Sequence, residues 1–455
     1  MAVYASADRA APHVRAADQA VPLAGLTPAQ TYLDPAQLLR AAHATGADAV
    51  HPGYGYLAES AGFAQAVLDA GLTWIGPPPA VIDRLADKVA ARRAARQAGA
   101  PLLPAMAAPA VGPADPAGPA GPAGHADPAG PADPAGPAEV ARFARDHGYP
   151  LVVKTAAGGG GAGVTVVRSA ADLPGACARA VEAAVAAGGR PAYFAERYLD
   201  RARHVETQCL ADRHGHVVVV STRDCSLQRR HQKIVEEAPA PFLPADVDAR
   251  LRAISEAILR KTGYVGAATC EFLLGRDGTL AFLETNPRLS VAHPVTEQVT
   301  GIDLVRETFR LAAGEPLDYG DPRPRGHAVQ FRIYAEDPGR GFAPARAPGT
   351  VRRWRPPSGP GVRVDSGVGP GSVVDPAFGT LLAKLVVSGT SRAEALHRAR
   401  NALADFEVTG VATSLPFYRG LVADEAFAPP DPARPFSVDT GWIESSAISC
   451  TPSAT

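Results

Sequence analysis

Three residues with charged or hydrogen-bonding side chains alternate along one short segment of this chain: Glu284, Asn286 and Arg288. They follow directly on a short apolar run that is typical of a buried strand. On an extended strand, residues two apart point to the same face, so these three side chains would face one site. Carboxylate and amide oxygens suit Mg²⁺, and a guanidinium binds anions, which together indicate a magnesium–phosphate site that also holds a second anion. The next two positions on that face, Ser290 and Ala292, carry no comparable chemistry.

A second acidic residue, Glu271, lies in the apolar segment that comes before, and the turn sequence Gly-Arg-Asp-Gly separates the two segments. This pattern predicts a β-hairpin with one carboxylate on each strand, facing each other. Two opposed carboxylates repel each other unless a cation lies between them, and an ion pair with a nearby arginine is the alternative. Because Asn286 continues the same face, we interpret Glu271, Glu284 and Asn286 as metal ligands.

Lys154 ends another apolar segment and is followed by a run that contains four consecutive glycines, residues 158–161. The backbone amides of such a run can approach a phosphate without side-chain clashes, and the lysine can add a positive charge. A loop without any ligand is the alternative. The run matches neither a Walker loop, which ends in Gly-Lys-Ser/Thr, nor a dinucleotide-binding fingerprint with an acidic partner.

Two more segments carry groups that could bind a nucleotide. Residues 224–237 are dense in cations and follow a buried-looking strand, which predicts a loop whose lysine and arginines bind ATP phosphates or an oxyanion. A charged face exposed to solvent is the alternative for this segment. Residues 196–199, Glu-Arg-Tyr-Leu, lie at a strand end and could bind an adenine edge and a ribose.

The elements that must position these residues begin with alternating strands and helices. Strands are expected at 2–5, 47–50 and 72–75, with a helix over 59–70. This alternation predicts a parallel sheet with helices on its faces. In a doubly wound sheet, a strand and a helix normally come before the strand expected here at 2–5. We therefore expect the N-terminus to be cut short.

Residues 107–138 are a low-complexity tract of Pro, Ala, Asp and Gly, which predicts a disordered insertion that forms no helix. The tail, residues 445–455, is also expected to be disordered. Between them the predicted elements are helices over 139–146 and 392–405 and strands over 150–154, 192–196, 216–221 and 328–333.

The composition bounds the kind of protein. A chain of 455 residues is expected to form two or three domains, and a net charge of -1 gives no reason to expect nucleic-acid binding. No apolar run is long enough to cross a membrane, and the first residues lack the features of a signal peptide. The five cysteines show no metal-binding spacing, which is typical of a cytoplasmic protein.

The order of these segments resembles biotin carboxylase, the ATP-grasp component of acyl-CoA carboxylases. The resemblance is carried by His51-Pro-Gly-Tyr-Gly, Arg223-Asp-Cys-Ser-Leu-Gln-Arg-Arg-His-Gln-Lys, Glu236-Glu-Ala-Pro-Ala-Pro, His293-Pro-Val-Thr-Glu and Gly326-His-Ala-Val. It implies an α/β protein with a truncated doubly wound N-terminal domain (1–80), an ATP-grasp domain (81–313) and an α+β C-terminal lobe (326–433). The ATP-grasp domain would contain the disordered insertion (107–138) and a mobile lid (139–199).

The resemblance also implies roles for individual residues. It places ATP contacts at Lys88, Lys154, Gly160, Gly161, Glu196, Arg197, Tyr198, Leu199, His204, His231 and Gln232. It gives Glu271, Glu284 and Asn286 to two Mg²⁺ or Mn²⁺ ions, and Lys233, Arg288 and the backbone of Val291 to bicarbonate. Arg332 would stabilise the biotin enolate, so Lys233, Arg288 and Arg332 are the catalytic residues implied.

The implied reaction has two stages. Bicarbonate attacks the γ-phosphate of ATP to give carboxyphosphate, which breaks down to carbon dioxide and phosphate. The phosphate then deprotonates the ureido nitrogen of biotin. The chain has no Ala-Met-Lys-Met motif, so the biotin carrier protein must be a separate chain, with a carboxyltransferase subunit as a further partner. A homodimer is implied as well, and it would be weakened by a missing first strand and helix.

The chain departs from the family at four positions. The family has a glutamate at Ala292 that deprotonates bicarbonate, a glutamine at Ser290, an arginine at Ala162 and an aspartate at Gly379. Because alanine cannot accept a proton, we expect turnover to be lowered on the order of a hundredfold or more. Two alternatives remain: an ATP-binding subunit with weak catalysis in a carboxylase complex, or an ATP-grasp ligase for another carboxylate, with Ser290 and Ala292 making room for it.

Overall fold

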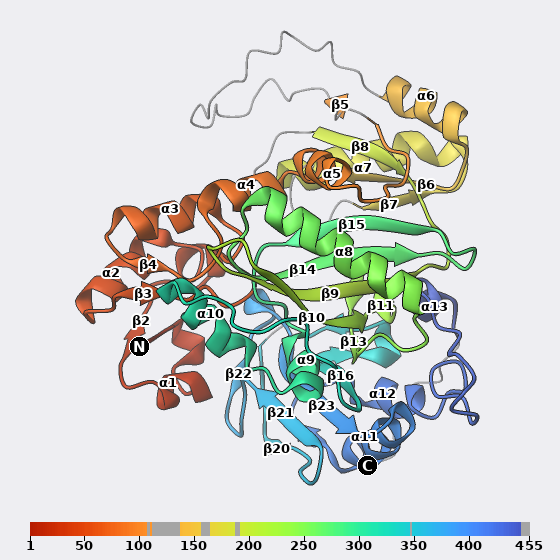
Figure 1. Ribbon diagram of the computed structural model, residues 1–455. Coiled ribbons are helices and arrows are strands. Elements are labelled where there is room, and N and C mark those ends of the chain that lie inside the picture. The colour runs from red at the N-terminus through yellow and green to blue at the C-terminus, as the bar shows by residue number, and fades with distance from the viewer. Residues whose placement is uncertain (107–109, 112–136, 156–163, 187–191, 346–347, 447–455) are drawn as a thin grey trace.

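The structure is a computed structural model that describes residues 1–106, 110–111, 137–155, 164–186, 192–345 and 348–446. Its largest sheet has eight antiparallel strands in the order β15-β14-β9-β10-β13-β16-β23-β21 (Figure 1). These strands are β9 (Arg203–Ala211), β10 (Val217–Asp224), β13 (Val235–Ala238), β14 (Gly266–Leu274), β15 (Leu280–Asn286), β16 (His327–Tyr334), β21 (Val362–Ser366) and β23 (Leu381–Gly389). Because β13 pairs with β16, the sheet runs without a break from the middle of the chain into its C-terminal region.

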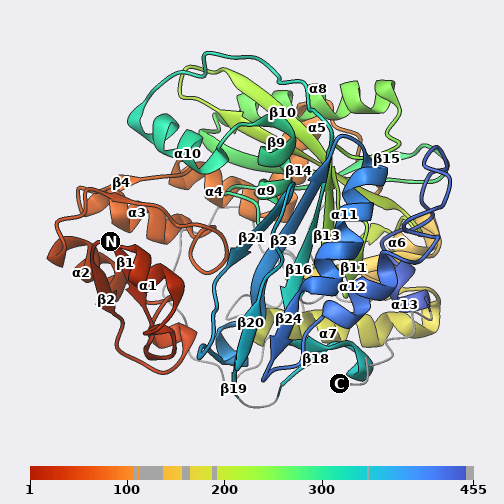
Figure 2. The ribbon, with the colours of Figure 1, turned by 90° about the horizontal axis from the view of Figure 1, so that it is seen from below.

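Helices cover both faces of the central strands. In β10, Val217 and Val219 pack toward α8 (Ala245–Thr262), while Val218 and Val220 pack with residues of α10 (Leu304–Ala313). Successive side chains of a strand point to opposite faces, so a strand covered on both sides is apolar throughout. This explains the unbroken run of four valines. The C-terminal half of the sheet is covered by α11 (Arg392–Asp405), as Figure 2 shows, and this helix has the bounds that the sequence predicts.

The N-terminal region contains two short parallel pairs. Strand β1 (Ala2–Tyr4) pairs with β2 (Ala20–Pro22), and β3 (Ala49–Val50) pairs with β4 (Thr73–Trp74). The parallel pairing agrees with the alternation in the sequence, but the two pairs are separate sheets. The helices here are α1 (Pro12–Ala16), α2 (Pro35–Ala44), α3 (Ala61–Asp69), α4 (Pro79–Ala86) and α5 (Lys88–Gln97).

The predicted helix over 59–70 begins two residues later than expected. Ser60 is the N-cap of α3, and its side chain accepts a hydrogen bond from the backbone N–H of Phe63 at 3.2 Å. A serine in this position favours the start of a helix directly after it, because its hydroxyl accepts from a backbone N–H of the first turn that has no partner in the helix. Glu59 is therefore left outside the helix, where its side chain can turn toward another part of the chain.

A second, four-stranded sheet has the order β5-β8-β6-β7. Its strands are β5 (Ala110–Val111), β6 (Leu151–Thr155), β7 (Thr165–Val167) and β8 (Ala192–Arg197). The helices in the same part of the chain are α6 (Pro137–His147) and α7 (Leu173–Ala186). Two parts of the low-complexity tract thus differ from the prediction: residues 110–111 pair with β8, and α6 begins within the tract. The rest of the tract and the glycine run, with Gly160, Gly161 and Ala162, lie outside the described residues.

Three further local expectations are corrected. Residues 224–237 form a small hairpin, β11 (Gln228–Arg229) with β12 (Gln232–Lys233), followed by β13, where a loop was predicted. Strand β15 ends at Asn286 because the next residue, Pro287, has no backbone N–H to pair, so the segment beyond it is not a strand. Ser445 ends a helix, α13 (Trp442–Ser445), and only part of the expected tail, 447–455, lies outside the description.

The remaining elements complete the C-terminal region. They are α9 (His293–Thr300), β17 (Glu336–Asp337), β18 (Ala343–Pro344), β19 (Gly349–Thr350), β20 (Arg353–Arg355), β22 (Val373–Val374), β24 (Glu407–Thr409) and α12 (Leu415–Leu421). The short strands between 349 and 374 agree with the Gly- and Pro-rich composition of that stretch. None of the helices in the described part of the chain combines the length and the apolar character needed to span a bilayer.

Candidate functional site

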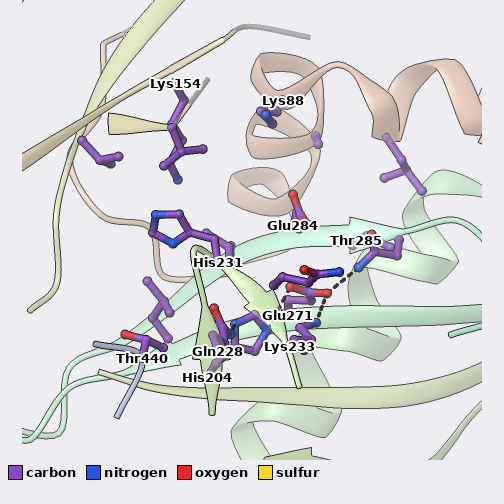
Figure 3. A pocket seen from close by; sticks show the side chains of 18 of the residues that line it. Lys88, Lys154, His204, Gln228, His231, Lys233, Glu271, Glu284, Thr285 and Thr440 are labelled. Carbon is purple, nitrogen blue, oxygen red and sulfur yellow. Dashed lines mark hydrogen bonds and ion pairs between the residues drawn. The ribbon is translucent and has the colours of Figure 1, made fainter. Parts of the chain in front are cut away.

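One cavity of about 880 Å³ collects the residues that the sequence singled out. Its walls come from the four-stranded sheet, the hairpin β11–β12, strands β14, β15 and β16, and the N-terminal region. Figure 3 shows Lys88 and Lys154 on one side of this space and Lys233 and Glu271 on the other. The predicted site residues that line it are Lys88, Lys154, Glu196, Arg197, Tyr198, Leu199, His204, His231, Gln232, Lys233, Glu271, Glu284, Asn286, Arg288, Val291 and Arg332. The other two predicted residues, Gly160 and Gly161, lie outside the described part of the chain.

At one end of the cavity, two cationic side chains pair with a single buried carboxylate, and a third lies nearby. Glu196 is paired with Lys154 at 2.9 Å and with Arg92 at 2.7 Å. Lys88, the first residue of α5, lies nearby, with its Nζ 3.5 Å from the backbone oxygen of Thr155. Burial lowers the pKa of Lys88, and the charge of Glu284 partly offsets this effect. This end has an excess of positive charge, which suits the phosphates of a nucleotide.

Sequence reasoning missed Arg92, although a signal for it exists. Arg92 lies four residues after Lys88, so both side chains fall on one face of α5. Its guanidinium also donates to the backbone oxygen of Leu103 at 2.6 Å. Arg92 therefore holds Glu196 in place from α5, while Lys154 contacts Glu196 from the neighbouring strand β6.

The hairpin prediction for the two acidic residues is confirmed. Glu271 and Glu284 are direct partners in the register of β14 and β15. The cation beside Glu271 is a lysine rather than the arginine of the alternative interpretation: Lys233 Nζ lies 2.5 Å from Glu271 and 2.6 Å from Glu206. His204 Nε2 lies 2.9 Å from Glu271, and the Asn286 amide donates to Glu271 at 2.5 Å.

The two facing carboxylates differ in their electrostatics. Burial would raise the pKa of Glu271, but Lys233 and His204 together outweigh burial and hold that pKa well below the ordinary value. The pKa of Glu284 is raised, first by burial and then by the charge of Glu271. Within the described residues, the Glu284 carboxylate makes no hydrogen bond or ion pair that would relieve this repulsion.

These observations fit a divalent cation at Glu271, Glu284 and Asn286, because hard oxygen donors converge there and one carboxylate lacks a partner. Another group with metal-ligand distances is His204, Glu206 and Glu271, whose ligand atoms lie within 4.8 Å of one another. Lys233 and Arg223 already neutralise Glu206, so the face that carries Glu284 is the better metal site.

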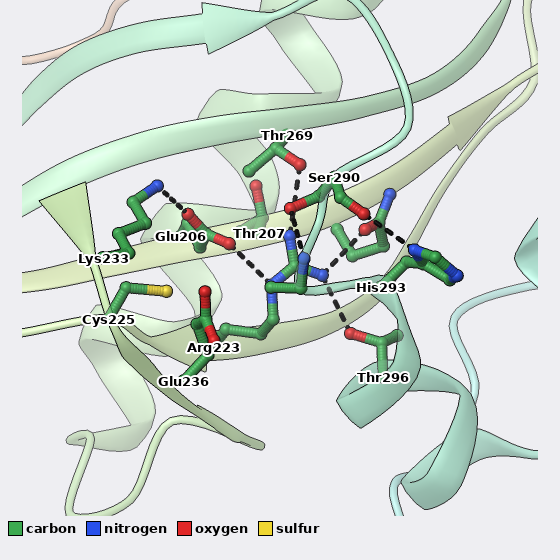
Figure 4. Close-up of polar contacts among 12 residues, drawn as sticks. Glu206, Thr207, Arg223, Cys225, Lys233, Glu236, Thr269, Ser290, His293 and Thr296 are labelled. Carbon is green, nitrogen blue, oxygen red and sulfur yellow. Dashed lines mark hydrogen bonds and ion pairs between the residues drawn. The ribbon is translucent and has the colours of Figure 1, made fainter. Parts of the chain in front are cut away.

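Beneath the cavity, Arg223 forms a fully buried polar network (Figure 4). Its guanidinium donates to Glu206 at 2.6 Å, Gln208 at 2.7 Å, Thr296 at 2.9 Å and Thr269 at 3.1 Å. Burial would raise the pKa of Glu206, but the charges of Lys233 and Arg223 lower it to about 2. Glu206 is therefore a fixed negative charge that holds Lys233 in place.

Sequence reasoning also missed Glu206 and Gln208. Together with His204 they occupy alternate positions of β9, so they share one face of that strand. The same alternation had identified Glu284, Asn286 and Arg288. A further polar residue, Gln228, lines the cavity and hydrogen bonds to His204 Nδ1 at 2.9 Å.

At the other end of the cavity, two arginines each meet a carboxylate. Arg288 Nε donates to Glu59 at 2.7 Å, and its NH2 group donates to Asn286 at 3.2 Å. Arg332 is paired with the fully buried Glu236, with an Nε–Oε1 distance of 2.6 Å. Burial disfavours the charge of Arg332, but Glu236 and Tyr334 together outweigh burial and raise its pKa. Both guanidinium groups line the cavity, which suits the binding of anions.

The segment after Arg288 places Ser290 and Ala292 differently from the strand-based expectation. Ala292 is the N-cap residue of α9 and has no exposed surface. It does not belong to the described residues that line the cavity. Ser290 lines the cavity, but its hydroxyl accepts from the backbone N–H of Ala292 at 3.1 Å. His293 begins α9, and its Nδ1 lies 2.8 Å from the backbone oxygen of Ser290. Burial and then the charge of Lys384 lower the pKa of His293 to about 3.

Comparison with known proteins gives three family matches that cover most of the chain. Residues 1–82 match the family "Biotin carboxylase, N-terminal domain", residues 128–319 match "Carbamoyl-phosphate synthase L chain, ATP binding domain", and residues 330–445 match "Biotin carboxylase C-terminal domain".

Several relatives are similar over nearly the full chain. The alpha3 subunit of the biotin-dependent acyl-coenzyme A carboxylase of Mycobacterium leprae is 51% identical, over 98% of this chain and 70% of the relative. The biotin carboxylase of Haemophilus influenzae is 41% identical, over 94% of this chain and 90% of the relative.

Solved structures of the same kind superpose closely. The biotin carboxylase domain dimer of Hydrogenobacter thermophilus 2-oxoglutarate carboxylase, in complex with MgADP, ADP and bicarbonate, has a TM-score of 0.87 and 34% identity, with 97% of this chain and 91% of that chain covered. The biotin carboxylase of Campylobacter jejuni in complex with β,γ-ATP also has a TM-score of 0.87, with 31% identity, and the match covers 98% of this chain and 92% of that chain.

Proposed function

This chain belongs to the biotin carboxylase family, and we propose that it uses ATP and bicarbonate to carboxylate biotin. The observation that carries this proposal is the layout of one cavity. Lysines suited to phosphates, a facing pair of carboxylates suited to a divalent cation, and two arginines suited to anions line a single space. ATP, a metal ion and bicarbonate can therefore meet there with their reacting groups side by side.

We assign the nucleotide to the end of the cavity formed by α5 and the four-stranded sheet. Lys88 and Lys154 would bind phosphate oxygens, and residues 196–199 would hold the adenine and ribose. The further ATP contacts that we propose are Gly160, Gly161, His204, His231 and Gln232. Glu271, Glu284 and Asn286 would hold Mg²⁺ or Mn²⁺, which neutralises phosphate charge when it is bound.

Lys233, Arg288 and the backbone of Val291 would hold bicarbonate against the γ-phosphate. A bicarbonate oxygen then bonds to the γ-phosphorus as ADP leaves, which gives carboxyphosphate. This intermediate splits into carbon dioxide and phosphate, the phosphate removes the ureido proton of biotin, and the nitrogen attacks carbon dioxide. Arg332 would stabilise the negative charge that develops on the ureido oxygen.

The biotin in this proposal is carried by a separate biotin carboxyl carrier protein, and a carboxyltransferase subunit uses the carboxybiotin. The relatives include subunits of several biotin-dependent carboxylases, such as the alpha subunit of rice methylcrotonoyl-CoA carboxylase, which is 40% identical. We further propose that this chain forms a homodimer. The Hydrogenobacter structure of this kind is a dimer.

The proposal is tested by measuring ADP release from ATP and Mg²⁺ with free biotin present and bicarbonate varied. We expect turnover to require both bicarbonate and biotin. ATP that binds without bicarbonate-dependent turnover would instead support the subunit with weak catalysis. Turnover that depends on a different carboxylate would support another ATP-grasp ligase.

The metal assignment predicts the effect of Glu284→Gln. A neutral amide is a weaker ligand than a carboxylate, so the Mg²⁺ concentration for half-maximal ATP turnover should rise by about tenfold or more, since the loss of even an outer partner of a metal ligand costs that much. Without Mg²⁺ the variant should be at least as stable to heat as the parent, because the repulsion with Glu271 is removed. The control is Glu315→Gln, which alters a surface ion pair. An unchanged Mg²⁺ dependence would exclude Glu284 as a ligand.

A further inference from the structure

Glu59 reaches the cavity from a part of the chain distant in sequence. It lies just before the N-cap of α3, and its Oε1 is 2.7 Å from Nε of Arg288, which is 229 positions away in the sequence. The side chain of Glu59 is 38% exposed, and that of Arg288 is 20% exposed. Both residues line the same cavity. The N-terminal region therefore contributes a carboxylate to the end of the cavity that we assign to bicarbonate.

The other acidic residues of the described cavity wall belong to the parts of the cavity that we assign to the nucleotide and to the metal. Glu196 lies between Arg92 and Lys154, at the nucleotide end. Glu271 is bound by Lys233 and His204, and Glu284 faces Glu271 across the hairpin, where we place the metal. Among the cavity residues that the structure describes, Glu59 is the carboxylate that contacts the anion-binding Arg288. It uses one oxygen for that contact and has a second oxygen available.

The reaction needs an acceptor for one proton at this place. Bicarbonate must lose its O–H proton as one of its oxygens bonds to the γ-phosphorus. Arg288 presents Nε to Glu59, and its two NH groups point to other acceptors, Asn286 and the backbone oxygen of Leu289. Each terminal NH2 group has a second N–H, so a bicarbonate bound there would share the guanidinium with Glu59, with the charge of Arg288 compensating both anions.

We propose that Glu59 is the general base that deprotonates bicarbonate in this protein. The O–H bond of bicarbonate breaks and its proton moves to Glu59. The oxygen forms a bond to the γ-phosphorus, and the bond from that phosphorus to the bridging oxygen of ADP breaks. The proton on Glu59 then passes to solvent, to which its side chain is partly open. The inference depends on the function proposed above.

Neighbouring residues cannot take this role. Ala292 has no group that accepts a proton and is fully buried. His293 already uses Nδ1 toward the backbone oxygen of Ser290, and its buried imidazole lies beside the cationic Lys384. With Glu59 as the base, the low turnover expected from Ala292 no longer follows.

The test is Glu59→Gln, compared with Glu59→Ala. The glutamine oxygen can still accept from Arg288 Nε, so the contact survives while the base is lost. We expect both variants to lower kcat for bicarbonate-dependent ATP hydrolysis by about 10²-fold or more, with KM for ATP nearly unchanged. If Glu59 only ties the N-terminal region to Arg288, Glu59→Gln should keep most of the activity that Glu59→Ala loses, and that result would overturn the proposal.

A second measurement separates catalysis from damage to the site. ATP formation from ADP and carbamoyl phosphate transfers a phosphoryl group in the same cavity and releases carbamate, without removing a proton from bicarbonate. Glu59→Gln should retain this activity, and its loss would overturn the assignment of Glu59 as a base. Asp69→Asn, on the exposed end of α3, is the matched control. A parent protein without bicarbonate-dependent hydrolysis would contradict the proposed function itself, which is a distinct outcome.

Discussion

Replacing Lys233 with glutamine is expected to lower bicarbonate-dependent ATP turnover by about 10²- to 10³-fold, the loss typical when one charge-stabilising group is removed from an active site. The same change should destabilise the fold. Lys233 lies between Glu206 and Glu271, two buried carboxylates at 2.6 and 2.5 Å. Although burial disfavours the ammonium charge, these two carboxylates raise the pKa of Lys233. Without the lysine, the two negative charges face each other away from water, which costs roughly 3–5 kcal/mol.

Thermal and denaturant unfolding without Mg²⁺ measure the stability effect, since a divalent cation could partly replace the lost charge. The double variant Lys233→Gln with Glu206→Gln should recover much of the stability, because one of the two opposed charges is removed. It should not recover turnover. Lys261→Gln is the surface control, since that lysine makes only a weak contact with the backbone oxygen of Gln97. A Lys233→Gln protein as stable as the parent would show that the carboxylates do not depend on this lysine.

Replacing Arg223 with methionine should remove a large part of the stability of the fold. Arg223 is the largest of the fully buried side chains and donates hydrogen bonds to four residues on three elements. Methionine fills most of the space but leaves Glu206 facing Lys233 without its second cation. We expect a loss of roughly 3–5 kcal/mol in the free energy of unfolding, as for other broken buried ion pairs. Turnover should fall as well, because Glu206 would no longer hold Lys233 in one position.

Urea unfolding of Arg223→Met, Glu206→Gln and the double variant isolates the coupling between the two side chains. The double variant should lose less stability than the two single variants lose in total. When both residues are replaced, neither charge is left without its partner. Arg252→Met is the matched control. Arg252 binds Asp248 and Asp321 near the surface, and its loss should cost about 1 kcal/mol or less. Equal losses for the two arginines would contradict the importance of burial at Arg223.

Local patterns in the sequence predicted much of this site. The hairpin with its facing Glu271 and Glu284 follows from apolar segments joined by a turn, and helix α11 was predicted with the bounds it has. The alternation that revealed Asn286 also existed at His204 and Glu206. It was not recognised as a site because the partners of Glu206 come from other elements.

Other features depend on contacts that no local pattern contains. The approach of Glu59 to Arg288 joins residues 229 positions apart, and only the packing of the N-terminal region against the end of β15 creates it. The strand predicted to continue to Ala292 ends at Asn286, because the proline that follows cannot pair with a neighbouring strand. The expectation that Ala292 continues the face of Glu284 and Asn286 was therefore wrong, whereas Ser290 still lines the cavity.

The unbroken pairing of β13 with β16 fixes a distance that the reaction must respect. The backbone N–H of Arg332 donates to the oxygen of Ile234, the residue after Lys233. The backbone of the arginine assigned to biotin thus lies a single strand spacing, about 4.8 Å, from that of Ile234, the neighbour of the lysine assigned to bicarbonate. Carbon dioxide released beside one has only a short path to the other, and main-chain hydrogen bonds set its length. The sheet thereby keeps the short-lived carbon dioxide close to biotin, its acceptor.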